Sequence, residues 1–445
     1  MSLLDNLNEI LSELIRPEAY YMDSNTIKEL RTKAIKIVHK IHYENNKYYH
    51  DLCKTRGVSE TIDEKDFHKI LIPDEVFKSY PMDFPEDDVP NFVKWLSNVI
   101  SVPIPEGITS AKDIDDLLRQ FDEKGLLLGF SSGTTGRMTF LPRDKLTQDY
   151  LVKSYVATVL GNVKLELGKE YFVLAIPRET YLQIGWNGRM VANAISPGNV
   201  FFAIDKLDAK IIRIRTGKLK NFKEKVMKKL IGMFLPRVER KAEEKIIKKL
   251  AERRGKKTIF LAPPYMIASV AKTVLEKGID VKMREDSIIT STGGFKGRKP
   301  ISKKDLVKLI EDTFGIDGNR YTDLYGMTES NSIIMECLEG SNKHIPPWIE
   351  PIILDENLEP IEPHGRVKGR YAFIEPSLIS YPSGIMTGDE VIVDWDGCDV
   401  CNRYGPIIEN IERLPTVEGR GSVSYTHLRA HETRHDLVCR LLLEK

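Results

Sequence analysis

The feature that most constrains the fold is a regular alternation of short apolar runs with segments of helical periodicity between residues 126 and 325. Runs of this length predict strands, and strands that alternate with helices predict a layered α/β domain with a largely parallel sheet. Ligands of such sheets gather at the carboxyl ends of the strands. The expected strands are Leu126 to Phe130, Tyr171 to Ile176, Val200 to Ile204, Thr258 to Leu261, Ser287 to Ser291 and Arg320 to Tyr325.

Different patterns flank this region. From Asp5 to Cys53 apolar residues recur at helical spacing, with a break at Pro17, so an all-helical N-terminal region is expected. A proline-rich connector follows, with two short helices expected over Asn91 to Ile100 and Ser110 to Asp122. Beyond Ile333 the chain becomes strand-rich, which predicts a smaller β subdomain packed beside the sheet. The runs that indicate it are Ile349 to Leu354, Val367 to Ile374 and Glu390 to Val393.

These patterns divide the chain into four parts. We expect a helical region and connector over residues 1–123, an α/β core over 124–332 and a β-rich subdomain over 333–420. Residues 421–445 form the fourth part. Within them, Ser424 to Thr433 and Asp436 to Lys445 resemble the translation of a sequencing-library adapter, so we leave them out of fold reasoning. A native basic tail or a histidine-rich metal site is the competing interpretation.

Charge and cysteine usage exclude several classes of protein. Lysine plus arginine (66) nearly balances aspartate plus glutamate (65) in 445 residues, so no overall field favours nucleic acid or an acidic membrane. No apolar stretch is long enough for a transmembrane helix, and the acidic N-terminus is unlike a secretion signal. Five cysteines do not make a disulfide framework in a chain of this length. A cytoplasmic location is expected.

The run LLLGFSSGTTGRMTFLPRDK contains a candidate phosphate-binding loop from Ser131 to Gly136. Gly133 and Gly136 allow backbone amides to approach an anion, and the hydroxyls of Ser131, Ser132, Thr134 and Thr135 add donors. A plain hairpin turn would have a similar composition. The P-loop of nucleoside triphosphatases is excluded, because no Gly-Lys-Ser/Thr ends the run.

Two further motifs follow in order, YTDLYGMTES (Tyr321 to Ser330) and YPSGIMTGDE (Tyr381 to Glu390). Together with the loop they resemble the adenylate-forming superfamily of acyl and aryl CoA ligases. IPDEVFKSYP, STGGFKGRK, KHIPPWI and CDVCNRYGP are similar to its phenylacetate-CoA ligase and bacterial acyl-protein synthetase branch. The resemblance covers about Ile72 to Arg420 and implies a layered, mostly parallel large N-terminal domain with a β subdomain. The small C-terminal domain of that family is expected to be missing.

The resemblance also implies roles for individual residues. The loop from Ser131 to Gly136 would cover the β- and γ-phosphates of ATP, Thr328 would touch the α-phosphate, and Glu329 would bind Mg²⁺. Tyr325 would lie against adenine, with Gly293 and Gly294 leaving room beside it. Asp389 would accept hydrogen bonds from the ribose hydroxyls. Arg420 would contact ribose and phosphate, although Arg413 is near enough in sequence to be confused with it. Phe295 would line the acyl pocket or belong to the core.

Two features stand outside these motifs. The lysine-rich segment from Lys218 to Lys257 is amphipathic, and Pro236 is expected to divide it into two helices. A solvated helical face is its ordinary interpretation, and a membrane-surface or acidic-partner site is the alternative. Cys398 and Cys401 form one CxxC pair. Zinc needs four ligands, and Cys337 with His344 would complete the set only if folding brought them together; packed thiols are the alternative.

The predicted function is ATP- and Mg²⁺-dependent activation of a small-molecule carboxylate, a fatty or aryl acid, to an acyl adenylate with release of pyrophosphate. The acyl group would then pass to CoA or to a cysteine of an acceptor protein, with no nucleic-acid partner and no membrane span. Two alternatives remain open at this point. The chain would either adenylylate a cofactor, or bind nucleotide with little or no catalysis.

Overall fold

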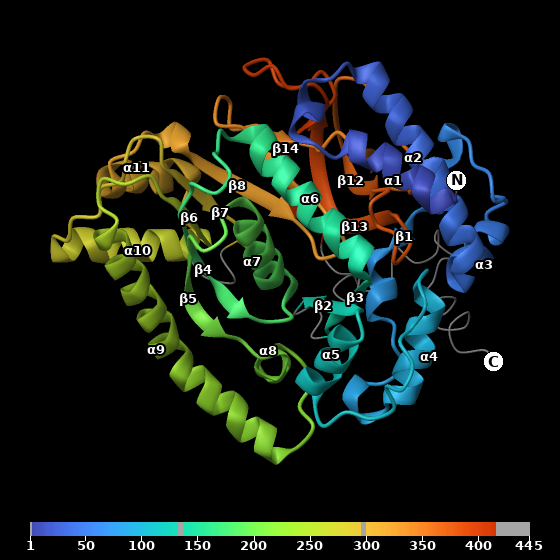
Figure 1. Cartoon of the computed structure of the whole chain (residues 1–445), viewed down its shortest axis with the longest axis horizontal. Coiled ribbons are helices and arrows are strands. Elements are labelled where there is room, and N and C mark those ends of the chain that lie inside the picture. The colour runs from blue at the N-terminus through green and yellow to red at the C-terminus, as the bar shows by residue number, and fades with distance from the viewer. Residues whose placement is uncertain (1, 132–136, 295–299, 415–445) are drawn as a thin grey trace.

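The computed structural model describes residues 2–131, 137–294 and 300–414. The chain begins with helices, continues with alternating strands and helices, and ends in a run of strands (Figure 1). The helices are α1 (Leu3–Leu14), α2 (Ser24–Asn45), α3 (Lys47–Thr55), α4 (Val89–Val99), α5 (Ile114–Glu123), α6 (Lys145–Asn162), α7 (Gln183–Ile195), α8 (Ala209–Thr216), α9 (Phe222–Glu252), α10 (Pro264–Lys277) and α11 (Lys303–Phe314). The strands are β1 (Ile72–Pro73), β2 (Leu127–Ser131), β3 (Thr139–Arg143), β4 (Phe172–Glu179), β5 (Val200–Lys206), β6 (Ile259–Ala262), β7 (Ile288–Ser291), β8 (Tyr321–Gly326), β9 (Ile333–Glu336), β10 (Lys343–His344), β11 (Glu350–Leu354), β12 (Arg366–Ile374), β13 (Gly384–Asp394) and β14 (Ile407–Arg413).

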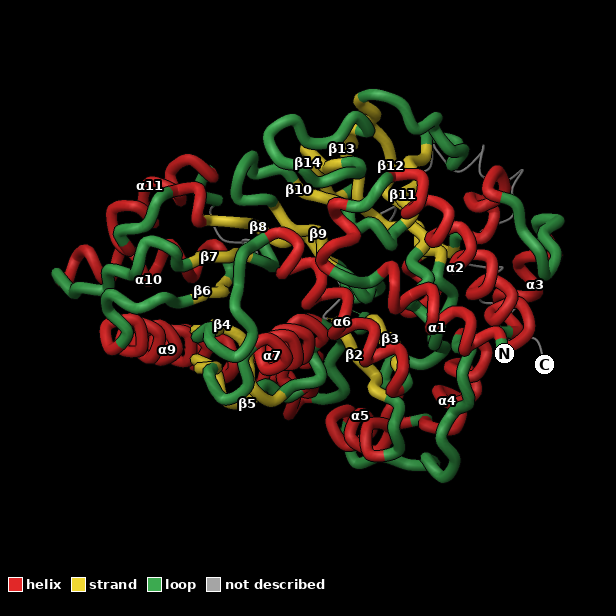
Figure 2. The backbone as a smooth tube through the Cα atoms, turned by 45° about the horizontal axis from the view of Figure 1, so that its top comes forward, coloured by secondary structure: helices red, strands yellow, loops and turns green. Residues whose placement is uncertain are grey.

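The expected parallel sheet is present. Strands β5, β4, β6, β7 and β8 are neighbours in that order and all pair in parallel. Helices α9, α10 and α11 lie around these strands at one end of the molecule, and α1 to α4 lie at the opposite end (Figure 2). The six strands expected between residues 126 and 325 are present, each to within a few residues. Five of them form this sheet, whereas the first, β2, pairs antiparallel with β3 in a separate two-stranded sheet.

The strand-rich region beyond residue 333 continues the same sheet. Strand β9 pairs antiparallel with β8, and the two-residue strand β10 joins β9 to β14. The order then runs β14, β13, β12, β11. The predicted β subdomain is thus joined to the parallel strands by a continuous ladder of hydrogen bonds, and the domain boundaries themselves stay a prediction.

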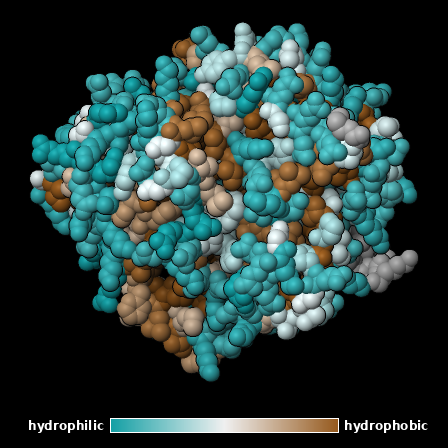
Figure 3. Space-filling view, in the orientation of Figure 1, coloured by the Kyte–Doolittle hydropathy of each residue, from teal (hydrophilic) through white to brown (hydrophobic). Residues whose placement is uncertain are grey.

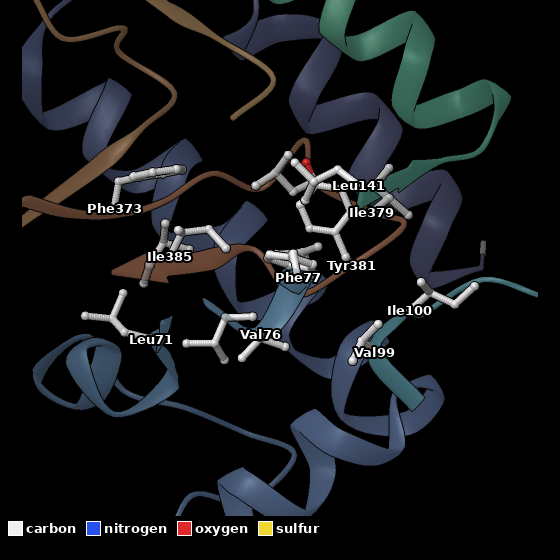
Figure 4. Packing of buried hydrophobic residues seen from close by; sticks show 14 of the residues in the cluster. Leu71, Val76, Phe77, Val99, Ile100, Leu141, Phe373, Ile379, Tyr381 and Ile385 are labelled. Carbon is white, nitrogen blue, oxygen red and sulfur yellow. The ribbon is translucent and has the colours of Figure 1, made fainter. Parts of the chain in front are cut away.

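The connector between the N-terminal helices and the sheet belongs to the core. Its strand β1 pairs in parallel with β13, Ile72 opposite Ile385. Immediately after it, Phe77 meets the ring of Tyr381 edge to face, with ring centroids 5.2 Å apart. Figure 4 shows these side chains within the apolar cluster that also contains Leu141 and Phe373. This packing fixes the short 3₁₀ helix at Asp74–Lys78 beside the sheet.

The lysine-rich segment departs from expectation. It forms one helix, α9, with Pro236 inside it, so the prediction of two helices was wrong. Proline removes one backbone N–H and crowds the carbonyl four residues earlier. Here that residue is Gly232, which is exposed and has no other atom within 4 Å of the position of a Cβ. Water can therefore hydrogen-bond to its carbonyl oxygen.

The surface of α9 is also more apolar than a solvated face. The first half of α9 exposes Phe222 by 76% and Met233 by 63%, whereas the buried apolar residues of this helix all lie in its second half. Apolar surface is visible along the lower edge of the molecule, where α9 begins in Figure 1 (Figure 3). Within the described residues, no helix combines the length and apolar composition that a membrane span requires.

Candidate functional site

The hairpin of β2 and β3 carries the candidate phosphate loop. Ser131 is the last residue of β2 and pairs with Thr139, while Ser132, Gly133, Thr134, Thr135 and Gly136 lie outside the described residues. The backbone N–H of Phe130 donates to the carbonyl of Tyr181, 3.2 Å away, just beyond the carboxyl end of β4. The loop therefore starts at the strand ends where ligands of parallel sheets bind.

Arg137 anchors the other end of the loop. Its guanidinium donates to the carbonyl oxygens of Tyr80 and Met82, the latter at 2.7 Å, and stacks 4.3 Å from the centroid of the Tyr80 ring. Both residues belong to the proline-rich connector. The two ends of the loop are thus held by the sheet and by the connector.

Tyr325 and Asp389 meet although 64 residues separate them in the chain. The hydroxyl of Tyr325 donates to Oδ2 of Asp389 at 2.8 Å, and Arg413 donates to Oδ1 at 3.0 Å. Burial, followed by the charge of Asp389, raises the pKa of Tyr325, so it keeps its proton. Two of the predicted nucleotide residues therefore come together. Arg413 is the arginine that contacts Asp389 in the described part of the chain; Arg420 lies outside it.

Glu329 is buried, with 8% of its surface exposed. Burial raises its pKa to about 7, the negative charge of Asp74 adds to the effect, and Lys78 opposes it. Asp74 pairs with Lys78 at 3.1 Å through one carboxylate oxygen, while its other oxygen, Oδ1, is buried without a hydrogen bond in the described protein. Arg413 also offsets part of the charge of Glu329 and Asp74. Two buried carboxylates are suitable ligands for a hard cation.

Sequence reasoning missed Asp74 and Lys78. They belong to IPDEVFKSYP, which served there only as a family resemblance. The signal was available, because an acidic pair and a lysine within an otherwise apolar, proline-bounded segment require a partner or a ligand.

Arg143 is a second residue that the sequence did not single out. It is fully buried and connects the strand after the phosphate loop to the motif that contains Thr328. Its guanidinium donates to the carbonyl oxygens of Thr328 at 2.8 Å and Ser330 at 3.1 Å. The side-chain oxygens of Asn331 and Gln183 accept its other bonds, at 2.9 and 3.0 Å. Thr328 and the hairpin are therefore held in one network of hydrogen bonds.

Gly293 and Gly294 follow the end of β7 with φ angles of 81° and 60°. Side chains rarely adopt this left-handed backbone, so glycine is favoured here for conformational reasons. Phe295, the candidate pocket residue after them, lies outside the described residues.

An apolar cavity of about 220 Å³ lies next to Thr328. Helices α6 and α7 form one wall, and strands β4, β6 and β7 form the other. Most of the lining is aliphatic, and a few polar groups, among them Gln183, Asn187 and Thr290, accompany it. The space suits a linear apolar group whose polar end reaches Thr328. The apolar lining comprises Val159, Val163, Leu165, Phe172, Leu174, Ile184, Val191, Ala192, Ile195, Ile259, Leu261, Ile288, Leu324, Met327, Ile333 and Met335.

Comparison with known proteins agrees with these motifs. Residues 237–427 match the family described as acyl-protein synthetase, LuxE. A long-chain-fatty-acid–luciferin-component ligase of Vibrio harveyi is 22% identical over 401 residues, which cover 87% of this chain and 85% of that protein. These two matches support a ligase activity for this chain.

Solved structures support the fold of this ligase. A 2-hydroxyisobutyryl-CoA ligase in its postadenylation state superposes with a TM-score of 0.60 at 11% identity, covering 92% of this chain and 71% of that one. The same enzyme in its thioesterification state gives a TM-score of 0.58 at 13% identity, over 90% and 71% of the two chains. The ligase thus has the α/β architecture that the sequence predicted.

Proposed function

We propose that this ligase activates a fatty acid. The carboxylate oxygen attacks the α-phosphorus of ATP, the bond from that phosphorus to the bridging oxygen of pyrophosphate breaks, and an acyl adenylate forms. A thiol then attacks the acyl carbonyl, AMP leaves, and the thiol proton passes to solvent. The observation that carries this proposal is the apolar cavity of about 220 Å³ beside Thr328.

The cavity favours an aliphatic over an aryl substrate. Helix α7 lines it over several turns, from Ile184 to Ile195, so the lining follows a path rather than enclosing one flat ring. The volume of about 220 Å³ is large enough for an extended run of methylene groups. Burial of each methylene contributes about 0.8 kcal/mol. The printed name of the Vibrio harveyi relative, which specifies a long-chain fatty acid, agrees with this assignment.

The nucleotide would lie over the carboxyl ends of β7 and β8. Asp389 would bind the ribose hydroxyls, since each carboxylate oxygen keeps a free lone pair after its bond from Tyr325 or Arg413. The ring of Tyr325 would lie against adenine, beside Gly293 and Gly294. Thr328 would contact the α-phosphate, and the loop from Ser131 to Gly136, with Arg420, would contact the phosphate chain.

Glu329 would hold Mg²⁺, whose chemistry is to neutralise the charge of the phosphates when it is bound. The fit rests on the buried carboxylate of Glu329 and the unpartnered oxygen of Asp74 near it. Mg²⁺ prefers one or two carboxylates together with water and phosphate oxygens. Asp74 and Glu329 would supply such carboxylates here.

Release of pyrophosphate from ATP tests the proposal. The purified chain is assayed with linear acids from butyric to palmitic and with phenylacetic acid, and we expect release that rises with chain length and little with the aryl acid. Faster release with phenylacetic acid would overturn the aliphatic assignment. Release with none of the acids would leave only the nucleotide-binding alternative, and release with a hydroxyl-bearing cofactor would favour adenylylation of that cofactor.

The acceptor is a separate question. The family match favours a protein cysteine, whereas CoA is the acceptor that the solved ligases contain. Incubating the preformed acyl adenylate with CoA, or with a candidate acceptor protein, and measuring thioester by mass spectrometry decides between them. We propose a protein acceptor, and efficient acylation of CoA would overturn that choice.

A further inference from the structure

Four potential metal ligands meet away from the proposed ATP site. Cys337 follows β9, His344 belongs to β10, and Cys398 and Cys401 lie in the connection between β13 and β14. One sulfur or nitrogen atom of each residue lies within 4.8 Å of those of the other three. Folding therefore joins the CxxC pair to a second pair that the sequence shows only as two separate residues.

The spacing of these atoms is close to that of a tetrahedral site. Zinc lies about 2.3 Å from thiolate sulfur and about 2.0–2.1 Å from imidazole nitrogen, so neighbouring ligand atoms are about 3.5–3.8 Å apart. Sγ of Cys401 and Nε2 of His344 are 3.3 Å apart. The 4.8 Å limit on the whole set leaves roughly 1 Å of contraction to complete the tetrahedron, which side-chain rotation can supply.

N–H groups near both pairs of ligands donate hydrogen bonds to the cysteine sulfurs. The backbone N–H of Gly340 donates to Sγ of Cys337 at 3.4 Å, and Nδ2 of Asn342 donates to Sγ of Cys398 at 3.1 Å. The backbone of Val400 and of Cys401 also donates to Sγ of Cys398. Hydrogen bonds of this kind orient the ligands of a metal and stabilise thiolate. Packed thiols would have no need for so many donors.

Two features bring the turns together. A Cβ at Gly340 would lie 2.1 Å from Cγ2 of Val400 and 3.6 Å from Sγ of Cys398, so glycine permits the close approach. The guanidinium of Arg403 is buried near Cys401, where it can offset the net negative charge of three thiolates around one divalent cation. It also donates to Glu339, within the turn between Cys337 and His344, at 2.9 Å.

We propose that Cys337, His344, Cys398 and Cys401 bind one structural Zn²⁺. All four positions of the tetrahedron come from protein, whereas a catalytic zinc keeps one position for water or substrate. Binding replaces the thiol protons with the metal, and those protons pass to solvent.

The site joins parts of the fold that are distant in sequence. His344 is paired through β10 with both β9 and β14, at the junction between the parallel strands and the β-rich strands. From the same turn, Arg403 donates to the carbonyl oxygens of Gly161 and Asn162 at the end of α6. The metal would therefore hold the junction of the sheet and, through Arg403, the helix that follows the phosphate-loop hairpin.

Metal content of the full chain, purified without chelator or metal-affinity resin, tests the site. Inductively coupled plasma mass spectrometry should find one zinc per chain, and the double variant Cys398→Ser/Cys401→Ser should lose it. Cys53→Ser, at a buried cysteine of α3, is the matched control and should keep it. A variant with His427, His431 and His435 changed to alanine should also keep it, which separates this site from the histidines near the C-terminus.

A second measurement does not depend on the folding of the double variant. Replacement of the metal by Co²⁺ in the unsubstituted chain should give thiolate-to-cobalt charge transfer in the near ultraviolet and the strong visible bands of a tetrahedral ion. An octahedral spectrum, zinc that persists in the double variant, or absence of zinc with a disulfide between Cys398 and Cys401 in peptide mapping would each overturn the proposal.

Discussion

Replacing Glu329 with glutamine should stabilise the ligase at high pH while removing its magnesium-dependent activity. Burial and Asp74 raise the pKa of Glu329 to about 7, from an ordinary value of 4.5. The folded state therefore binds this proton more tightly than the unfolded state, and the associated stability is present below about pH 4.5 and lost as pH rises through about 7. Glutamine is uncharged throughout and escapes this loss.

The magnitude follows from the two pKa values. Their difference, at about 1.36 kcal/mol per pH unit, gives a cost of about 3 kcal/mol once the carboxyl is fully ionised. At about pH 5 the same calculation leaves only about 1 kcal/mol. Without Mg²⁺ and ATP, Glu329→Gln should exceed the unsubstituted chain in free energy of unfolding by these amounts, because the glutamine amide occupies nearly the same space.

Urea unfolding followed by circular dichroism at about pH 8.5 and about pH 5 measures the effect, and pyrophosphate release measures activity. Glu356→Gln, at an exposed position, is the matched control and should change neither quantity. Two results would refute the reasoning. One is a Glu329→Gln chain that is less stable than the unsubstituted chain at about pH 8.5, and the other is a stability difference that does not change with pH.

Three further substitutions test other parts of the site. Ala192→Phe fills the cavity, and loss of about three methylene contacts at about 0.8 kcal/mol each should lower kcat/KM for lauric acid roughly fiftyfold, with a smaller effect on butyric acid. Ala194→Phe, on the exposed side of α7, should change neither, and equal loss for both acids would contradict the cavity assignment. Asp389→Asn should raise KM for ATP at least tenfold, since charge-assisted hydrogen bonds contribute about 1.5–3 kcal/mol, and an unchanged KM would exclude the ribose role. Arg143→Met leaves four buried acceptors unpaired and should lower the free energy of unfolding by about 3 kcal/mol or more in urea, and Arg143→Lys should recover little because lysine lacks the planar fork. A loss below about 1 kcal/mol for Arg143→Met would contradict the structural role of this network.

The strands between residues 126 and 325 could be predicted because each is a short apolar run between polar, helix-forming segments. Strand β13 was harder, since only Glu390 to Val393 reads as a strand and the observed element starts at Gly384. Its first half contains glycine and threonine, and pairing with β1 and β12 on either side overrides their weak preference for strand. The prediction of two helices around Pro236 was wrong. The effect of a proline depends on whether water or protein surrounds the carbonyl four residues earlier, which sequence alone does not show.

The site shows a similar division. Tyr325, Asp389 and Glu329 could be proposed from sequence because each lies in a compact motif that sequence alone displays. Asp74 and Arg413 reach the same place from segments far from those motifs, and the contact exists only after the connector packs against β13. Cys398 and Cys401 are close in sequence, whereas their partners come from another strand pair. Sequence alone therefore could not show whether the four metal ligands meet.

The contact between Tyr325 and Asp389 says something about the shape of the sheet. Four strand-to-strand steps separate β8 from β13, through β9, β10 and β14, which on a flat sheet would be about 19 Å. The two side chains touch at 2.8 Å, and the ring of Tyr325 also lies 6.4 Å from that of Tyr371 on β12. The sheet must therefore curve between β8 and β13. The two-residue strand β10 lies on the path between them, so the spacing of the proposed ribose site depends on one of the two shortest strands of the sheet.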